Sequence, residues 1–326
     1  MQLPRPRCEG AREEKGNSLR SLAAALVCLV VCSAVGASDG VAATARPRTP
    51  RLAALPPRPQ DGITGSQFAI RTAAWSERDR QRAAVDEIER GNLPRYLGRL
   101  RPVELRWQPS GRDVITATIW VTPDYLALGS ADDFLYMPLS WPSATEVAQR
   151  FGCVLPTPKM VDAIYAQSRA HLEPQPLPAG SEMRSNAYFE RHQKLIDAQR
   201  AGIARGTLLS GHKKDVVLTN RLLGHPDRVA IYGWHRLDGR PIQPLSTVHG
   251  VRYADYSHGV RLVWHEVWID GSPHEILDVL ADPALAPLLS DEGAIRDPRV
   301  MLDPQRAALA ALRPFDAGPA LASIRR

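Results

Sequence analysis

Histidine is concentrated in one part of this sequence and limits the chemistry that the chain could perform. Seven of the nine histidines lie between residues 212 and 274. Residues 246–264 read STVHGVRYADYSHGVRLVW and contain two His-Gly pairs, at His249 and His258, with Asp255 between them. Because the imidazole pKa lies near neutrality, histidine serves as general base, general acid or metal ligand. The clustering favours a functional site over scattered surface or core histidines.

A cysteine nucleophile is one form that this site could take. Cys153 would attack as the thiolate, and a histidine at position 235, 249 or 258 would accept its proton. Asp255 would orient that ring. This version predicts that Cys153→Ser abolishes activity and leaves the fold intact. The flanks of Cys153 are apolar, which also suits an inert buried thiol.

A zinc site is the alternative form. His249, Asp255 and His258, together with His212, offer nitrogen and oxygen ligands that suit zinc, whose bound water would be the nucleophile. The favoured version needs no cofactor.

A non-catalytic protein that binds the cell wall or its glycans is a third hypothesis. Trp234, Trp264 and Trp268 would then form a platform on which sugar rings stack, and the histidines would be incidental. In the enzyme versions, the side chains that we expect to bind substrate are His212, Lys214, Trp234, Tyr253 and Arg261.

The segment SHGVR at 257–261, preceded by the His249-Gly250 pair, resembles part of the L,D-transpeptidase signature. In that signature a nucleophilic cysteine follows SHG, and Val260 stands in its place here. The same stretch resembles the SxHxxGxAxD block of zinc D,D-carboxypeptidases through Ser246, His249 and Asp255, with spacings that differ by one residue.

A longer stretch resembles papain-like bacterial cell-wall endopeptidases. Cys153 precedes DVVL at 215–218 and RVAIY at 228–232, in the order that the family shows. The resemblance implies that Cys153 is the nucleophile. Arg228 occupies the position of the family's base and cannot accept a proton, so another histidine would have to replace it. The blocks GHKKDVVLT, VAIYGWH, PIQPL and DYSHGVRLV together resemble an uncharacterised family of secreted bacterial proteins.

The N-terminus predicts export. Residues 21–37, SLAAALVCLVVCSAVGA, are uncharged and apolar, follow basic residues and end in small residues, which is typical of a signal peptide. The run is shorter than the ~18–20 residues that span a bilayer, so we expect no stable membrane anchor after cleavage. The mature protein would be secreted or periplasmic and would keep Cys153 as its one cysteine, with no partner for an intramolecular disulfide.

The charge of the chain points away from nucleic acid. The whole sequence carries a net charge of +6, and removal of residues 1–37 leaves 36 Lys and Arg against 32 Asp and Glu, or +4. The basic residues are spread out and form no stripe with interleaved aromatics. A cell-wall peptide or glycan is the partner that export and this mild charge accommodate.

The elements that must position these side chains alternate between strands and helices. Strands are predicted near 103–107, 114–121, 125–128, 134–137, 215–219, 229–234 and 260–269, and helices near 76–90, 142–151, 157–168 and 182–205, with two short helical runs in 273–289. This order predicts an α+β fold, an antiparallel sheet with a helical insertion between its strands. We expect a signal peptide at 1–37, a flexible Pro/Arg/Ala-rich spacer at 38–66, one domain at 67–297 and a weakly ordered tail at 298–326.

Overall fold

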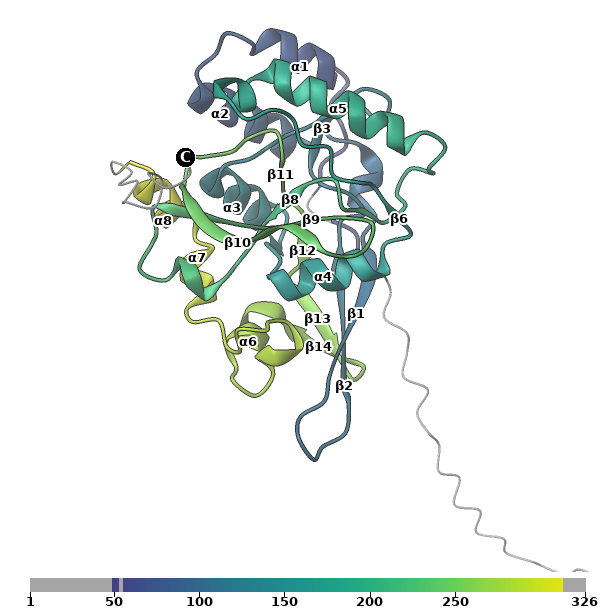
Figure 1. The fold of residues 1–326 in the computed structure, drawn as a ribbon, viewed down its shortest axis with the longest axis vertical. Helices are drawn as coiled ribbons and strands as arrows, with labels where there is room; N and C mark the ends of the chain where they lie inside the picture. The colour runs from purple at the N-terminus through teal and green to yellow at the C-terminus, as the bar shows by residue number, and fades with distance from the viewer. Residues whose placement is uncertain (1–48, 53–54, 313–326) are drawn as a thin grey trace, which may run out of the picture. The chain divides into compact units, whose positions relative to one another are not determined.

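Two β-sheets organise the part of the chain that the computed structural model describes, residues 49–52 and 55–312 (Figure 1). The predicted signal peptide at 1–37 lies outside the described residues. Among the helices of the described part, none combines the length and the apolar character that crossing a membrane requires.

The first sheet has six strands, and all of its pairings are antiparallel. Its order is β14-β13-β2-β12-β5, and β1 forms a hairpin with β2. The strands are β1 (Arg101–Trp107), β2 (Ile115–Val121), β5 (Cys153–Val154), β12 (Val263–Trp264), β13 (Glu266–Ile269) and β14 (Ser272–Glu275). The hairpin of β1 and β2 is the one that the alternating residues 103–107 and 114–121 predict.

The second sheet has the order β10-β9-β8-β11. Five of the predicted site residues lie on it: Lys214, Trp234, His235, His249 and His258. Its strands are β8 (Lys214–Val216), β9 (Arg228–His235), β10 (Pro241–Gly250) and β11 (His258–Gly259). The pairings of β9 are antiparallel, whereas β11 runs parallel to β8 and sets His258 opposite Lys214. The sequence pattern does not predict β10, because this strand contains two prolines and is mostly half-exposed.

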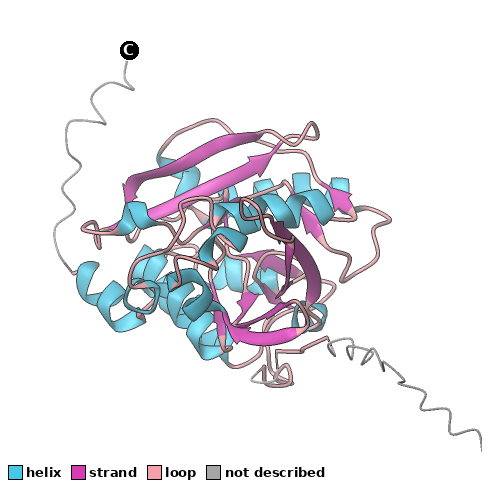
Figure 2. Cartoon of the chain, turned by 90° about the horizontal axis from the view of Figure 1, so that it is seen from below, coloured by secondary structure: helices cyan, strands magenta, loops and turns pink. Residues whose placement is uncertain are grey.

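Helices cover the sheets on more than one side (Figure 2). The α-helices are α1 (Gly65–Arg71), α2 (Glu77–Glu89), α3 (Trp141–Arg150), α4 (Pro158–Gln167), α5 (Asn186–Arg200), α6 (Ile276–Ala281), α7 (Pro298–Met301) and α8 (Pro304–Ala310). Short 3-10 turns lie at η1 (Arg95–Gly98), η2 (Ser181–Arg184), η3 (Asn220–Leu222) and η4 (Ala286–Leu288), and two small strand pairs join β3 (Ala127–Gly129) to β4 (Phe134–Tyr136) and β6 (Ala170–His171) to β7 (Leu209–Ser210).

Local capping explains where two of the predicted helices begin. The Ser76 hydroxyl accepts a hydrogen bond from the Asp79 amide, and the Thr157 hydroxyl accepts one from the Met160 amide. Both hydroxyls satisfy amides that have no partner inside the helix. Pro158 follows Thr157 in the first turn of α4, where its missing amide proton costs nothing.

The α+β class with antiparallel sheets is confirmed. Near the N-terminal end of the described residues, Leu52 is buried and Arg51 bridges to Arg99. Near the C-terminal end, α7 and α8 are helical, and Ala307 and Ala310 are buried. The described parts of the expected spacer and tail therefore pack on the domain.

Candidate functional site

Two of the predicted site residues stack at the end of β10. The imidazole ring of His249 lies 4.0 Å from the phenol ring of Tyr253, centroid to centroid, and the ring planes differ by 9°. The ring of His258 lies 6.3 Å from that of His249 and 5.6 Å from that of Tyr253. His249, Tyr253 and His258, which all belong to the segment 246–264, therefore lie close together.

The carboxylate of Asp255 anchors this cluster. Its Oδ2 accepts a hydrogen bond from the Tyr253 hydroxyl at 2.9 Å, and its Oδ1 accepts bonds from the Ser257 amide at 2.8 Å and hydroxyl at 2.6 Å. Burial opposes ionisation of Asp255. At the low pH at which His258 is protonated, the positive charges of His258 and Lys214 and the bonds from Ser257 outweigh burial and lower the pKa of Asp255 to about 2. Asp255 is therefore an ionised positioning group at neutral pH.

His258 lies beneath the stacked pair with its hydrogen-bonding capacity unused. Only 1% of the residue is exposed, and neither ring nitrogen has a hydrogen-bond partner among the described residues. Burial, reinforced by the nearby lysines and His249, lowers the pKa of His258 to about 4, although Asp255 opposes this. The ring is therefore neutral at pH 7. A buried imidazole whose nitrogens bond no protein group is uncommon in folded proteins.

Lys214 brings a positive charge to the same site from β8. It is the register partner of His258, and its ammonium lies 5.0 Å from the ring centroid of Trp234. Burial lowers the pKa of Lys214, and the carboxylate of Asp255 partly restores it. Trp234 itself has a φ of 56°, an uncommon conformation for a bulky residue, and its indole nitrogen has no partner among the described residues.

The cluster is partly exposed to solvent. His249, Tyr253 and Lys214 are half-buried, whereas Asp255 and His258 are buried. Burial lowers the pKa of His249, so its ring is also neutral at pH 7. The guanidinium of Arg184 lies 5.7 Å from the Tyr253 ring centroid. A substrate would meet a neutral imidazole, a phenol and two cations at this surface.

A turn at residues 256–257 follows Asp255 and brings the His258 ring beside that of Tyr253. The ring of Tyr256 lies instead 4.9 Å from the ring of His192. Gly259, the partner of His258 in the second His-Gly pair, packs closely against the Tyr125 ring and Lys213, so no ligand fits against its backbone on that side.

Lys213 and His192 lie behind the cluster and were not predicted as site residues. The Lys213 ammonium donates to the Tyr256 carbonyl at 2.6 Å and contacts His192 Nδ1 at 3.1 Å. Burial lowers the pKa of Lys213 to about 7, despite the carboxylates of Asp255 and Asp124. His192 comes from α5, outside the histidine-rich region, so the sequence offered no signal that it would join this group.

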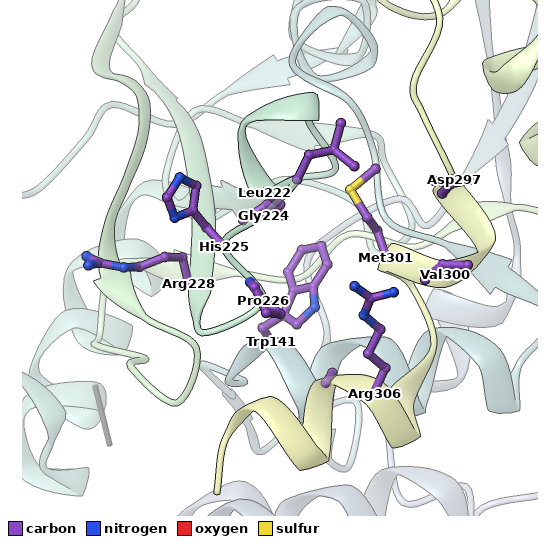
Figure 3. Close-up of a pocket in the computed structure, with 12 residues that line it drawn as sticks. Trp141, Leu222, Gly224, His225, Pro226, Arg228, Asp297, Val300, Met301 and Arg306 are labelled. Atoms are coloured by element: carbon purple, nitrogen blue, oxygen red, sulfur yellow. The ribbon is translucent and has the colours of Figure 1, made fainter. Parts of the chain in front are cut away.

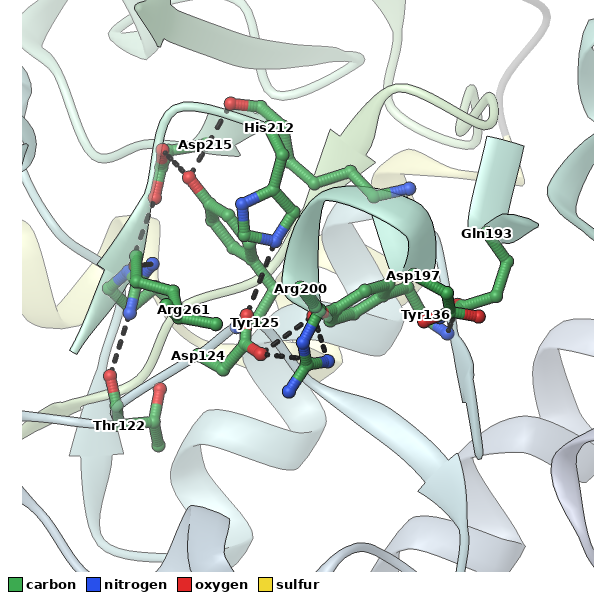
Figure 4. A network of polar contacts seen from close by, with 12 residues as sticks. Thr122, Asp124, Tyr125, Tyr136, Gln193, Asp197, Arg200, His212, Asp215 and Arg261 are labelled. Carbon is green, nitrogen blue, oxygen red and sulfur yellow. Dashed lines mark hydrogen bonds and ion pairs between the residues drawn. The ribbon is translucent and has the colours of Figure 1, made fainter. Parts of the chain in front are cut away.

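His212 belongs to a separate buried network (Figure 4). Its Nε2 lies 3.2 Å from Asp124 Oδ1, and its ring packs against Tyr125 and Tyr136. Asp124 Oδ2 accepts a 2.6 Å bond from the Tyr136 hydroxyl. Burial disfavours the Asp124 carboxylate, but its contacts with His212 and Arg200 and the Tyr136 bond outweigh this and lower its pKa to about 2. The structure does not bring His212 to the cluster around His249.

Arg261 and Asp215 belong to the same interior (Figure 4). Arg261 is fully buried, and its guanidinium donates to the carbonyls of Thr122 and Leu209, both at 2.7 Å. Asp215 accepts a 2.8 Å bond from the Tyr125 hydroxyl, and burial raises the pKa of Asp215 to about 6. Arg261 therefore braces the fold here, which differs from the substrate-binding role that the sequence suggested.

His235 lies at the far end of β9. Its Nε2 is 2.8 Å from Asp162 Oδ1, and its ring stacks on Tyr165 at 4.6 Å. These partners come from α4, and both satisfy and orient the imidazole. The structure does not bring His235 into contact with His249 or His258.

Cys153 lies in the other sheet. It pairs with Trp264 of β12, and its thiol donates weakly to the Phe151 carbonyl at 3.6 Å. Burial raises the pKa of Cys153 well above its ordinary value. A thiol of this kind stays protonated at neutral pH, and the Cys153 thiol donates to a backbone carbonyl rather than to a basic side chain.

The tryptophans of the proposed sugar platform also separate. Trp234 is buried in the second sheet, whereas Trp264 and Trp268 lie in the first, where Trp268 packs edge-to-face on Trp120. Within residues 49–52 and 55–312, no group of three or more His, Cys, Asp or Glu side chains is arranged to hold a metal ion.

A small pocket of about 70 Å³ opens elsewhere, between η3, α7 and α8 (Figure 3). Trp141 and Met301 line it together with Arg306. It contains none of the clustered residues around His249.

Comparisons with family models, curated proteins and solved structures found no match.

Proposed function

We propose that the protein is an exported hydrolase that cleaves peptide or amide bonds of cell-wall material, with water as the nucleophile and His249 as the general base. The observation that carries this proposal is the stack of a neutral His249 on Tyr253, whose hydroxyl is fixed by the Asp255 carboxylate. Export and a cell-wall substrate rest on the signal-peptide pattern at 21–37.

The half-buried residues would touch the substrate. His249 takes a proton from water, and the water oxygen attacks the carbonyl carbon of the scissile amide. The electron pair of the carbonyl moves to its oxygen, where the nearby Lys214 ammonium stabilises the negative charge. The imidazolium of His249 then returns the proton to the amine nitrogen as the carbon–nitrogen bond breaks.

The buried residues would position these groups. Asp255 holds the Tyr253 hydroxyl and hence the ring on which His249 lies. His258, neutral and without a hydrogen-bond partner among the described residues, would support the stacked pair from the interior. Cys153 has no part in this mechanism, because its buried thiol lies in the other sheet with a raised pKa.

Cleavage of purified cell-wall sacculi by wild type and three variants tests the proposal, with released products separated by liquid chromatography and mass spectrometry. We expect His249→Gln to lower the rate by about 10²–10⁴-fold, the range for loss of a general base. His274→Gln, an exposed histidine on β14, is the matched control and should keep full activity. Cys153→Ser should also stay active.

Two results would contradict the proposal. Loss of activity in Cys153→Ser, with the fold intact by circular dichroism, would restore the cysteine mechanism. Binding of sacculi by wild type without any cleavage would favour the non-catalytic wall-binding protein.

A further inference from the structure

A groove of about 750 Å³ lies between α2, α3 and the C-terminal helix α8. These three helices lie on the same side of the molecule in Figure 1. Its walls come from both ends of the domain, and the loop that follows β10 contributes Arg252 and Ala254. The apolar part of the lining consists of Val85, Pro142, Ala254, Ala308, Ala311 and Leu312.

The groove adjoins the proposed catalytic site in two ways. Arg252 and Ala254, which line it, are the chain neighbours of Tyr253. Glu77, which also lines it, forms a 3.1 Å ion pair with Arg184, the residue whose guanidinium lies near the Tyr253 ring. A chain lying in the groove would therefore pass the residues on either side of Tyr253.

The charges that line the groove are unequally matched. Glu146 is paired with Arg82 at 2.8 Å, and Asp79 accepts the Ser76 hydroxyl in the first turn of α2 at 2.6 Å. Three arginines of the lining, at 78, 80 and 252, form no ion pair within the described ranges, against one carboxylate, Asp79, that forms none. This excess of unpaired cations beside an apolar wall complements a chain that carries carboxylates and small apolar side chains.

We propose that this groove binds the substrate chain, an acidic peptide of the cell wall, and delivers its amide bond to His249. The inference rests on the proposed function and names its substrate class. Arg252 would bind a carboxylate of the peptide, and α8 would cover its apolar side chains.

Binding of an N-acetylated cell-wall stem pentapeptide, measured by calorimetry with the full chain, tests the inference. All variants are made in the His249→Gln background so that turnover does not interfere. Ala308→Trp fills the groove from its exposed wall, and we expect it to weaken binding at least tenfold. Leu309→Trp is the matched control, because Leu309 is 66% exposed on the same helix and does not line the groove.

A second pair of variants tests the charge. Arg252→Ala should weaken binding of the pentapeptide and leave binding of its amidated form, which lacks the C-terminal carboxylate, unchanged. Arg112→Ala, in the exposed turn between β1 and β2, should affect neither.

Equal affinities for Ala308→Trp and Leu309→Trp would overturn the inference. A truncated chain that lacks residues 313–326 provides a second test. If the truncation raises the affinity for the pentapeptide tenfold and Ala308→Trp has no effect in the truncated chain, the inference is overturned. The end of the chain would then be the occupant of the groove. If wild type cleaves sacculi but Ala308→Trp and Arg252→Ala bind the pentapeptide as well as their controls do, the groove inference is wrong and the proposed function stands. If the groove binds the pentapeptide but wild type cleaves nothing, the proposed function is wrong.

Discussion

The imidazole of His249 lies flat on the phenol ring of Tyr253, at 4.0 Å and 9°, while the Tyr253 hydroxyl donates to Asp255. The carboxylate thus fixes a ring, and that ring fixes the proposed base. His249 needs no direct hydrogen bond to a carboxylate to be oriented in this arrangement, which distinguishes it from a catalytic triad.

Removal of the Tyr253 ring should change the titration of His249. Burial lowers the pKa of His249, so Tyr253→Ala, which uncovers one face of the imidazole, should raise that pKa toward the ordinary value of about 6.5. Tyr253→Phe keeps the ring and should leave the pKa lowered. Titration of the imidazole protons by NMR measures both, and equal pKa values in the two variants would contradict the role of the stack.

The pH dependence of kcat/KM should be bell-shaped. The proposed base must be neutral, so activity should fall as the pH drops through the pKa of His249, below about 6.5. Lys214 must be charged, and its lowered pKa places the alkaline limb below about 10.4. Lys214→Arg should move only the alkaline limb upward, because arginine stays charged. An alkaline limb that does not respond to Lys214→Arg would exclude Lys214 from the charge-stabilising role.

Folding stability should depend on the buried ring of His258. Its pKa is about 4 in the folded protein and about 6.5 in the unfolded chain, so the unfolded chain binds the proton first as the pH falls. The stability that comes from keeping this ring neutral is complete above pH 6.5 and is lost progressively down to pH 4. Between pH 7 and pH 5 the loss is on the order of 2 kcal/mol.

Urea unfolding at pH 7 and pH 5 measures this loss in wild type and in His258→Asn. We expect the change in unfolding free energy between the two pH values to be smaller in the variant by that amount. Asp255 titrates below this range and contributes to neither measurement. An identical change in both proteins would show that His258 is protonated in the folded state at pH 5.

The close approach of Gly259 to the interior should make it intolerant of a methyl group. A Cβ at this position would lie 2.6 Å from a ring carbon of Tyr125 and 2.8 Å from the Lys213 Cβ. We expect Gly259→Ala to destabilise the protein by about 1–3 kcal/mol, since the Tyr125 ring must move and its bond to Asp215 is disturbed. Gly180→Ala, which meets no atom within 4 Å, is the control in the same thermal unfolding experiment.

The helices could be predicted from local sequence signals. The bounds of the strands could not, because they depend on pairing with segments that are distant in sequence. The caps at Ser76 and Thr157 mark helix starts because they act within one turn. The apolar run at 260–269 was predicted as one strand, but it breaks at His265, whose amide bonds to Gly152, and divides between β12 and β13. Partners of this kind are distant in sequence and leave no local pattern.

The candidate site was predictable only in part, for the same reason. His249, Asp255 and His258 share one short segment, so their proximity follows from the chain itself. His235 and His212 come from the same histidine-rich region, but strand direction and local partners place them elsewhere. The contribution of His192 depends on how α5 docks, which no periodicity in its own sequence reveals.

Two adjacent residues of strand β8 carry opposite charges and face opposite sides of the strand. Lys214 faces the cluster around His249, while the next residue, Asp215, faces the buried tyrosine and arginine. Deletion of one residue before β8 would set Asp215 where Lys214 now lies and Lys214 where the buried Lys213 lies, because each residue of the strand would move by one position. A carboxylate would then face His249 in place of the ammonium. Insertion of one residue would instead set Lys213 in that place and keep the positive charge. The segment between β7 and β8 should therefore tolerate deletions less well than the exposed β1–β2 turn does.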